Sequence, residues 1–369
     1  MKNRFLALFL LLALFLLPAC GVTKHSVSAV TSGAVERQSV SSFSVFFSAE
    51  DTRSMSNFML GNRFTHHNKL LYGSRHDETG QPYLCRMKFS STQKGMYVRE
   101  TEPVDLQADA QYLALSGDWL YYLREASSGS TSIVRIPAAY GSSVAPETLY
   151  SHPCDFLSLR FGRLYFTDAS HHFLSMALDG SDVQPVLADK EVYYPYLLTA
   201  DLLLYQDDAD NESLHLRYLP TGFDLRLASG PVYSFILQGS MLYFLKAEEG
   251  ERCRLSRLDL NTFLSSFDPT SRPNAAFTFD IETAENTLGT YFSINGDHLN
   301  ACNYQTAALS SWHSLSDDSW SIGRTSACQY VSPDFEIFYN YNSSSLITEM
   351  LFYEPSSKRP SYIEYYVYQ

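Results

Sequence analysis

The stretch GRLYFTDASHHFLSMALDGSDVQPVLAD, Gly162 to Asp189, contains short apolar and aromatic runs separated by turn residues. Runs of this length bounded by turn residues are typical of strands. With the residues just before it, the stretch predicts four consecutive strands, Phe156–Phe161, Arg163–Asp168, Phe173–Asp179 and Val183–Ala188. An Asp-Gly turn precedes the last of them. Four antiparallel strands in one unit are the composition of a β-propeller blade.

This unit recurs along the chain. Its apolar-aromatic centre aligns at Tyr72, Tyr121, Tyr165, Tyr205, Tyr243, Asn300 and Phe338. The spacing ranges from 38 residues, between Tyr205 and Tyr243, to 57 residues, between Tyr243 and Asn300. A period of roughly 40–50 residues indicates a propeller or a solenoid, and units with little room for two helices favour the propeller. We therefore predict an all-β fold, a β-propeller of four-stranded antiparallel blades, with seven blades and with six or eight as the alternatives.

One copy of the unit also carries a family motif. The segments LYFTD and LDGS resemble the repeat of the YWTD propellers of low-density lipoprotein receptor-related proteins. The matching residues are Tyr165, Thr167, Asp168, Leu178, Asp179, Gly180 and Ser181, with Phe166 in place of the tryptophan. Bacterial lipoproteins with a related domain of unknown function look similar along most of residues 50–369. The resemblance implies a propeller, and the YWTD family has six blades.

The chain begins MKNRFLALFLLLALFLLPAC, in which Lys2 and Arg4 precede an apolar run from Phe5 to Leu17. The run is shorter than the roughly 20 residues that span a bilayer, and this pattern is typical of a secretory signal peptide. The ending LPAC resembles the lipobox of bacterial lipoproteins, which implies that Cys20 is lipidated and becomes the first mature residue. A diacyl or triacyl cysteine carries enough apolar chain for stable anchoring.

These features divide the chain into three parts. Residues 1–19 are the expected lipoprotein signal peptide, residues 20–42 the lipidated Cys20 with a flexible tether rich in Ser, Val, Thr and Ala, and residues 43–369 a single propeller domain. We expect the protein to be exported and anchored to the cell membrane or the outer membrane through Cys20. The sequence leaves open whether the organism has an outer membrane.

The charge balance limits the partners. The formal net charge is −13 at pH 7, and removal of Lys2 and Arg4 with the signal peptide makes it −15. Nucleic-acid binding requires a basic surface, so we expect no nucleic-acid partner. We expect a monomer whose partners are the membrane, through its lipid, and an envelope protein or glycan.

Metal, cofactor and redox motifs are absent from the sequence. The cysteines after Cys20, at 85, 154, 253, 302 and 328, form no C-x-x-C pair. Buried thiols are favoured over a bridge between Cys302 and Cys328. The pairs His66-His67 and His171-His172 fit exposed turns, and Asp207–Glu212 resembles a calcium loop only faintly. We therefore expect no metal site and no cofactor.

No G-x-S-x-G nucleophile motif occurs, and we assign no catalytic residue. Aromatic side chains are the most suggestive binding groups, since flat rings suit sugars and peptides. The segment VYYPY, Val192 to Tyr196, is expected in a connection between blades, and two tryptophans fall in the most irregular repeat. The candidate binding residues are Tyr193, Tyr194, Tyr196, Tyr304, Trp312 and Trp320. Packing between blades is the alternative role for most of them.

Two segments bear on the closure of the ring. The tail Ser361–Gln369 alternates and can supply the last strand, while Ser41–Ala49 is also strand-like and would sew the ends together if it paired with the final blade. The expanded segment Asn261–Asn286 is the best place for a functional insertion.

Three functional hypotheses remain. The first is a non-catalytic, lipid-anchored binding or scaffold protein for a protein, peptide or glycan at the cell envelope. The second is an extracytoplasmic propeller enzyme, a glycan-active hydrolase or lyase that uses loop Asp, Glu and His residues. The third is an envelope assembly component without a small ligand.

Overall fold

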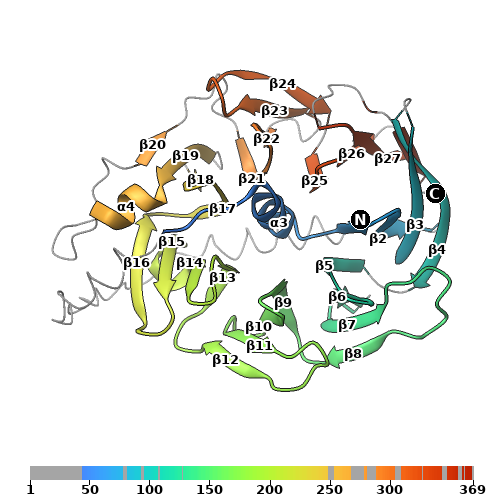
Figure 1. The fold of residues 1–369 in the computed structure, drawn as a ribbon, viewed down its shortest axis with the longest axis horizontal. Coiled ribbons are helices and arrows are strands. Elements are labelled where there is room, and N and C mark those ends of the chain that lie inside the picture. The colour runs from blue at the N-terminus through green and yellow to red at the C-terminus, as the bar shows by residue number, and fades with distance from the viewer. Residues whose placement is uncertain are drawn as a thin grey trace.

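The computed structural model describes most of the chain after residue 43. The described residues are 44–77, 81–92, 95–106, 109–126, 128–247, 253–266, 278–280, 288–303, 309–325, 327–342, 347–355, 360 and 362–367. They form seven blades arranged in a ring around a central channel (Figure 1). The predicted all-β fold and the predicted number of blades are both confirmed.

Each blade is a four-stranded antiparallel sheet whose strands follow one another in sequence from the channel to the rim. The strands are β1 (Phe64–His67), β2 (Leu70–His76), β3 (Pro82–Thr92) and β4 (Gly95–Asp105) in blade 1; β5 (Asp109–Ser116), β6 (Trp119–Glu125), β7 (Thr131–Pro137) and β8 (Glu147–Tyr150) in blade 2; β9 (Cys154–Arg160), β10 (Arg163–Asp168), β11 (Phe173–Met176) and β12 (Gln184–Leu187) in blade 3; β13 (Val192–Leu197), β14 (Leu202–Asp207), β15 (Ser213–Tyr218) and β16 (Phe223–Ala228) in blade 4; β17 (Val232–Gln238), β18 (Met241–Ala247), β19 (Cys253–Asp259) and β20 (Thr278–Asp280) in blade 5; β21 (Leu288–Asn295), β22 (His298–Asn303), β23 (Leu309–Ser314) and β24 (Trp320–Thr325) in blade 6; and β25 (Ala327–Val331), β26 (Glu336–Asn342), β27 (Ile347–Tyr353) and β28 (Tyr362–Val367) in blade 7.

The sequence repeat marks the same strand in every blade. The aligned centres, from Tyr72 in β2 to Phe338 in β26, all lie on the second strand. In blade 3 the four predicted strands correspond to β9–β12, and the expected Asp-Gly turn has Gly180 at a φ of +85°. A side chain at Gly180 would press on the backbone of Leu149 in blade 2. Gly180 thus serves both the turn and the close approach of two blades.

The second strand recurs because its residues pack between neighbouring blades. All six residues of β14 are buried, which means that both faces of this strand are covered. One apolar cluster joins blades 1 and 2, another joins blades 3 and 4, and a third joins blades 7 and 1. A single blade cannot bury two apolar faces by itself, so radial stacking supplies the core.

A helix, α3 (Ala49–Met59), lies inside the channel (Figure 1). Its start is a capping box, in which the Ser48 side chain accepts from the Asp51 N–H and the Asp51 carboxylate accepts from the Ser48 N–H. After Leu60 the chain leaves the helix at Gly61, which has a φ of +78°. Within the described residues, no helix is long and apolar enough to cross a membrane.

The described part of Ser41–Ala49 does not pair with the final blade, the alternative that would have sewn the ends together. Among residues 44–49, Phe47 pairs through an isolated bridge to Gly239, and the helix begins at Ala49. Blade 7 is completed by β28, so the prediction that the C-terminal tail supplies the last strand is confirmed. The junction of blades 7 and 1 is held by the cluster that includes Phe64, Tyr330 and Phe335 rather than by a shared strand.

The expanded segment of blade 5 is partly described. It contains α4 (Leu260–Ser266) and β20, the outer strand of the blade. Asn261 of α4 binds the backbone of Val45 through both side-chain atoms, at 2.8 and 3.0 Å. This part of the insertion therefore fastens the segment that leads into α3. The thiols of Cys85, Cys154, Cys253 and Cys328 are buried, and the side chain of Cys302 lies outside the described part.

Candidate functional site

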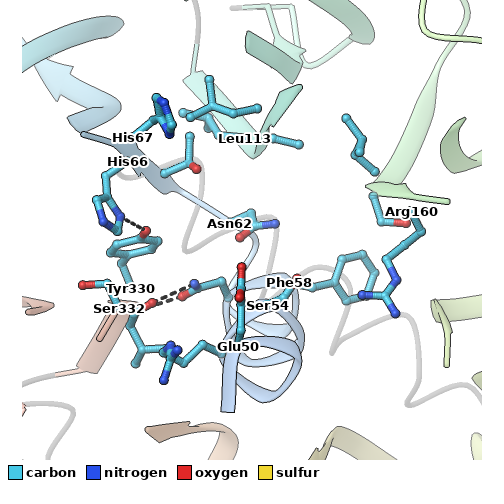
Figure 2. A pocket seen from close by; sticks show the side chains of 18 of the residues that line it. Glu50, Ser54, Phe58, Asn62, His66, His67, Leu113, Arg160, Tyr330 and Ser332 are labelled. Carbon is cyan, nitrogen blue, oxygen red and sulfur yellow. Dashed lines mark hydrogen bonds between the residues drawn. The ribbon is translucent and has the colours of Figure 1, made fainter. Parts of the chain in front are cut away.

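The helix α3 lies off-centre in the channel. It packs against the inner strands β17, β21 and β25 of blades 5, 6 and 7. The opposite side of the channel stays open as a cavity of about 550 Å³, which we call the crescent cavity. Its walls are α3, the ends of β1, β5 and β9, and the segment from Tyr330 to Pro333 (Figure 2). A cavity of this size suits a small ligand.

One face of α3 forms the floor of the crescent cavity. Glu50, Arg53 and Ser54 form the accessible part of this face, and the buried Asn57 and Phe58 border it where α3 meets the blades. The other face carries Thr52, Met55, Ser56 and Met59, which are buried against the blades. The helix is thus amphipathic: its more polar face lines the cavity, and its other face packs against the blades.

Arg160, at the end of β9, forms one wall (Figure 2). Its guanidinium group lies 5.0 to 5.9 Å from the rings of Tyr196, Phe161 and Phe47, within the range of cation–π attraction. Its Nη1 donates to the Tyr196 hydroxyl at 3.3 Å and lies 3.7 Å from a carboxylate oxygen of Asp51. Its Nε is buried without a hydrogen-bond partner in the described structure.

His66 and His67, at the end of β1, form the opposite wall with Tyr330 (Figure 2). His66 Nδ1 lies 2.6 Å from the Tyr330 hydroxyl, and its ring packs edge-on against Phe89 and Phe335. Burial lowers the pKa of His66, an effect partly opposed by the charge of Asp334. His66 therefore differs from the exposed turn residue that the sequence suggested, because it belongs to an innermost strand.

The predicted tyrosines lie in β13, the inner strand of blade 4, and not in a connection between blades as expected. Tyr196 lines the crescent cavity, although its ring is 1% exposed and packs on Phe47 and Phe58. Tyr193 and Tyr194 are half-buried; Tyr193 stacks on His171. Burial raises the pKa of Tyr194 to about 12.

The other predicted binding residues are elsewhere. Trp312 lies in β23 and Trp320 begins β24, the third and outer strands of blade 6; their side chains fall outside what the structure describes. Tyr304 lies outside the described residues altogether. Of the three candidates whose side chains the structure describes, Tyr196 is the one that lines the crescent cavity.

Blade 4 contains a second cluster of ionisable groups. Asp207, His215 and Asp224 bring possible metal-ligand atoms together, but the ammonium group of Lys190 lies 2.5 Å from Asp207 and 2.9 Å from Asp224. A cation of the protein therefore already occupies this position. Burial would raise the pKa of Asp224, but hydrogen bonds from His215, Tyr205 and Lys190 hold it well below its usual range.

The segment that resembled a calcium loop adjoins this cluster. Asp208–Asp210 forms the single 3₁₀ turn η1 at the tip of the hairpin between β14 and β15. The Asp210 carboxylate binds Arg226 at 3.0 Å and His215 Nε2 at 2.8 Å. The cluster is an internal ion-pair network of the blade, and we assign it no ligand.

Sequence reasoning missed Arg53, His66 and Arg160. A local signal for the helix was present, since Ser48 and Asp51 form a capping-box pattern, followed by apolar residues at Met55, Phe58 and Met59. That signal would have placed Arg53 on the opposite helix face. No local pattern singles out Arg160 or His66, because each is brought to the cavity only by the curvature of the ring.

Comparisons with known proteins show the fold and no family. No model of a known protein family matches the chain, and no curated protein matches it. Among solved structures, the chain is similar to a prolyl endopeptidase (TM-score 0.55, 12% identity, 91% of this chain and 54% of that one) and to the WD40 β-propeller domain of Doa1 (TM-score 0.51, 12% identity, 80% and 93%). A puromycin-hydrolyzing peptidase from Mycobacterium tuberculosis has a TM-score of 0.48 at 12% identity, over 87% of this chain and 62% of that one. The chain thus spans little more than half the length of these peptidases.

Proposed function

We propose that this protein is a lipid-anchored, extracytoplasmic β-propeller that binds a ligand in the crescent cavity without converting it. The observation that carries this proposal is the off-centre position of α3, which fills one side of the channel and leaves about 550 Å³ on the other. Residues from the inner strands of five blades form the rest of the wall, and rigid strands suit a preformed binding site.

The composition of the crescent cavity favours binding over glycan hydrolysis. Most glycosidases use a pair of carboxylates on either side of the scissile bond. Glu50 is the one carboxylate among the residues that line the cavity, beside two arginines and two histidines. The likeness to peptidases, at 12% identity, concerns the fold and supports no peptidase activity.

The binding proposal can be tested with a variant that fills the cavity. Ser54 is an exposed residue of the cavity-lining face of α3, so Ser54→Trp should occupy the crescent while leaving the buried helix face unchanged. The full chain in detergent micelles is dialysed against oligosaccharides and peptides released from the cell envelope, and the retained molecules are identified by mass spectrometry. We expect a component that wild type retains at least tenfold better than Ser54→Trp. Retention of nothing, or equal retention by both proteins, would overturn the proposal.

The anchor is a separate part of the proposal, supported by the signal-like segment and the LPAC ending. Residues Val45 and Phe47 lead into the channel beside the β17–β18 hairpin, on the face where the crescent cavity opens between the first hairpins of the blades. The cavity and the described start of the chain, at Val45 and Phe47, therefore lie on the same face. Cys20→Ser should abolish acyl labelling and release the protein from membranes, and membrane retention of this variant would contradict the anchor.

A further inference from the structure

The inner strand of each blade has one edge that faces the channel; in blade 6 the start of that strand, at Leu288, also pairs with Cys253 of blade 5. Opposed residues in an antiparallel pair alternate between hydrogen-bonded and non-hydrogen-bonded pairs, and the residues of the second kind point their N–H and C=O groups away from the partner strand. In β5 the pair Ser116–Trp119 closes the hairpin, so the next pair, Leu115–Leu120, is of the second kind. The backbone groups of Leu115 therefore face the channel.

The same register places equivalent residues around the channel. In blades 5, 6 and 7 they are Leu237, Ile294 and Val331. Side chains of α3 bind all three: Thr52 donates to the Leu237 carbonyl, Ser56 bonds both backbone groups of Ile294, and Asn57 bonds both backbone groups of Val331, at 2.8 to 3.1 Å. One side of α3 thus takes the place of the missing neighbouring strand in three blades.

On the open side, the equivalent residues are His66, Leu115 and Leu159. All three line the crescent cavity. The backbone N–H of His66 donates to the Tyr330 hydroxyl, whereas within the described residues the channel-facing backbone groups of Leu115 and Leu159 have no protein partner. Free strand edges of this kind bind extended peptides, because a peptide backbone offers the complementary donors and acceptors. The cavity therefore presents peptide-like hydrogen-bonding groups on the side that α3 leaves empty.

The charge of the crescent cavity adds a second requirement. Arg53 makes no hydrogen bond or ion pair with the described part of the chain, and Arg160 uses one of its five N–H donors on Tyr196. Asp51 caps α3 through Oδ2, and its Oδ1 forms an ion pair with Arg160 Nη1 at 3.7 Å, which leaves the other N–H groups of Arg160 for a ligand. Two guanidinium groups thus face the cavity of a chain whose net charge is −13. Their planar forks match a carboxylate.

We propose that the crescent cavity binds the C-terminal segment of a peptide, with the free edges at Leu115 and Leu159 facing its backbone and with Arg53 and Arg160 holding its terminal carboxylate. This inference rests on the proposed function and names its ligand class. The aromatic rings that surround the Arg160 guanidinium hold it in place and limit its contact with water. The lower local dielectric strengthens the attraction between the guanidinium and a nearby carboxylate.

The test compares two synthetic pools of N-acetylated tetrapeptides, one with free C-terminal carboxylates and one with C-terminal amides. The full chain in detergent micelles is dialysed against each pool, and retained peptides are quantified by mass spectrometry. We expect retention of the acid pool, at least tenfold lower retention of the amides, and at least a tenfold loss of acid retention in Arg53→Gln and in Arg160→Gln. Arg99→Gln, a change at an exposed residue of the outer strand β4, is the matched control and should leave retention unchanged.

The outcomes separate this inference from the proposed function. Equal retention of acids and amides by wild type, or unchanged acid retention in both arginine variants, overturns the carboxylate site. Retention of envelope oligosaccharides, lost in Ser54→Trp, without retention of either peptide pool overturns the peptide proposal and leaves the binding function standing. Because Arg160 is packed among aromatic rings, thermal unfolding of each variant is recorded, and Arg53→Gln decides the question if Arg160→Gln does not fold.

Discussion

The two sides of the central channel are built from the same strands but are completed differently. In blades 5 to 7, the free inner edges are bonded by Thr52, Ser56 and Asn57 of α3. In blades 1 to 3, the equivalent edges face a cavity. The ring repeat specifies seven similar inner strands, whereas a single helix can cover only part of their circumference. The difference shows that one short segment both stabilises the ring and determines where it is open.

The covered side also bears on how the ring is held closed. Each blade consists of four consecutive strands, so no shared strand joins blade 7 to blade 1. The chain that starts at α3 bonds blades 5, 6 and 7 and then blade 2, where the carbonyls of Gly61 and Asn62 accept from the N–H groups of Tyr112 and Leu113. It therefore bridges the junction from both sides. Stability should depend strongly on the covered face of α3 and weakly on its open face.

The largest expected effect concerns Asn57. Asn57→Leu removes two hydrogen bonds and leaves the buried N–H and C=O of Val331 without partners. Each such group costs about 1–3 kcal/mol, so we expect the free energy of unfolding to fall by about 3 kcal/mol. Urea unfolding followed by circular dichroism measures it. A decrease in the free energy of unfolding of less than about 1 kcal/mol would mean that α3 does not contribute to holding the ring together.

A pair of serines on α3 sharpens the comparison. Ser56→Ala leaves the backbone groups of Ile294 unpaired and should lower the free energy of unfolding by about 2 kcal/mol. Ser54→Ala changes the exposed, cavity-lining face, where the Ser54 hydroxyl accepts one long hydrogen bond from Tyr196 at 3.3 Å, and should cost less, about 0.5 kcal/mol. Because both changes raise helix propensity equally, the difference isolates the two faces. Equal effects in urea unfolding would contradict the division of α3 into a covered and an open side.

The smallest expected effect is a pH dependence on the open side. Because burial lowers the pKa of His66 in the folded state below its unfolded value, the unfolded chain takes up a proton first as the pH falls. The contribution of His66 to stability is therefore present near neutral pH and is lost on acidification. His66→Gln should lose less stability than wild type between about pH 7.5 and about pH 5.5. The same pH dependence in His66→Gln as in wild type would show that His66 is solvated.

The architecture could be predicted because it depends on local spacing repeated many times. Tyr72 and Phe338 lie 266 positions apart, yet each occupies the second strand of its blade. One local prediction was wrong, and one alternative for closing the ring did not hold, for the same reason. The aromatic run of Ser41–Ala49 and the run VYYPY have strand-like or loop-like composition, but α3 starts within the first and β13 contains the second. Composition does not show which segment enters the channel, where helix and strand alike can bury aromatic rings.

By itself, the sequence determined the all-β class, the four-stranded unit, its seven-fold recurrence and the position of the last strand. Each of these follows from alternation and turn chemistry within about 40 residues. Only the tertiary structure decided that α3 lies off-centre and that His66 and Arg160 share one cavity with Arg53. These residues belong to different blades and a preceding helix, and their proximity is set by how far the packed blades turn around the axis, a quantity that no single segment of the chain encodes.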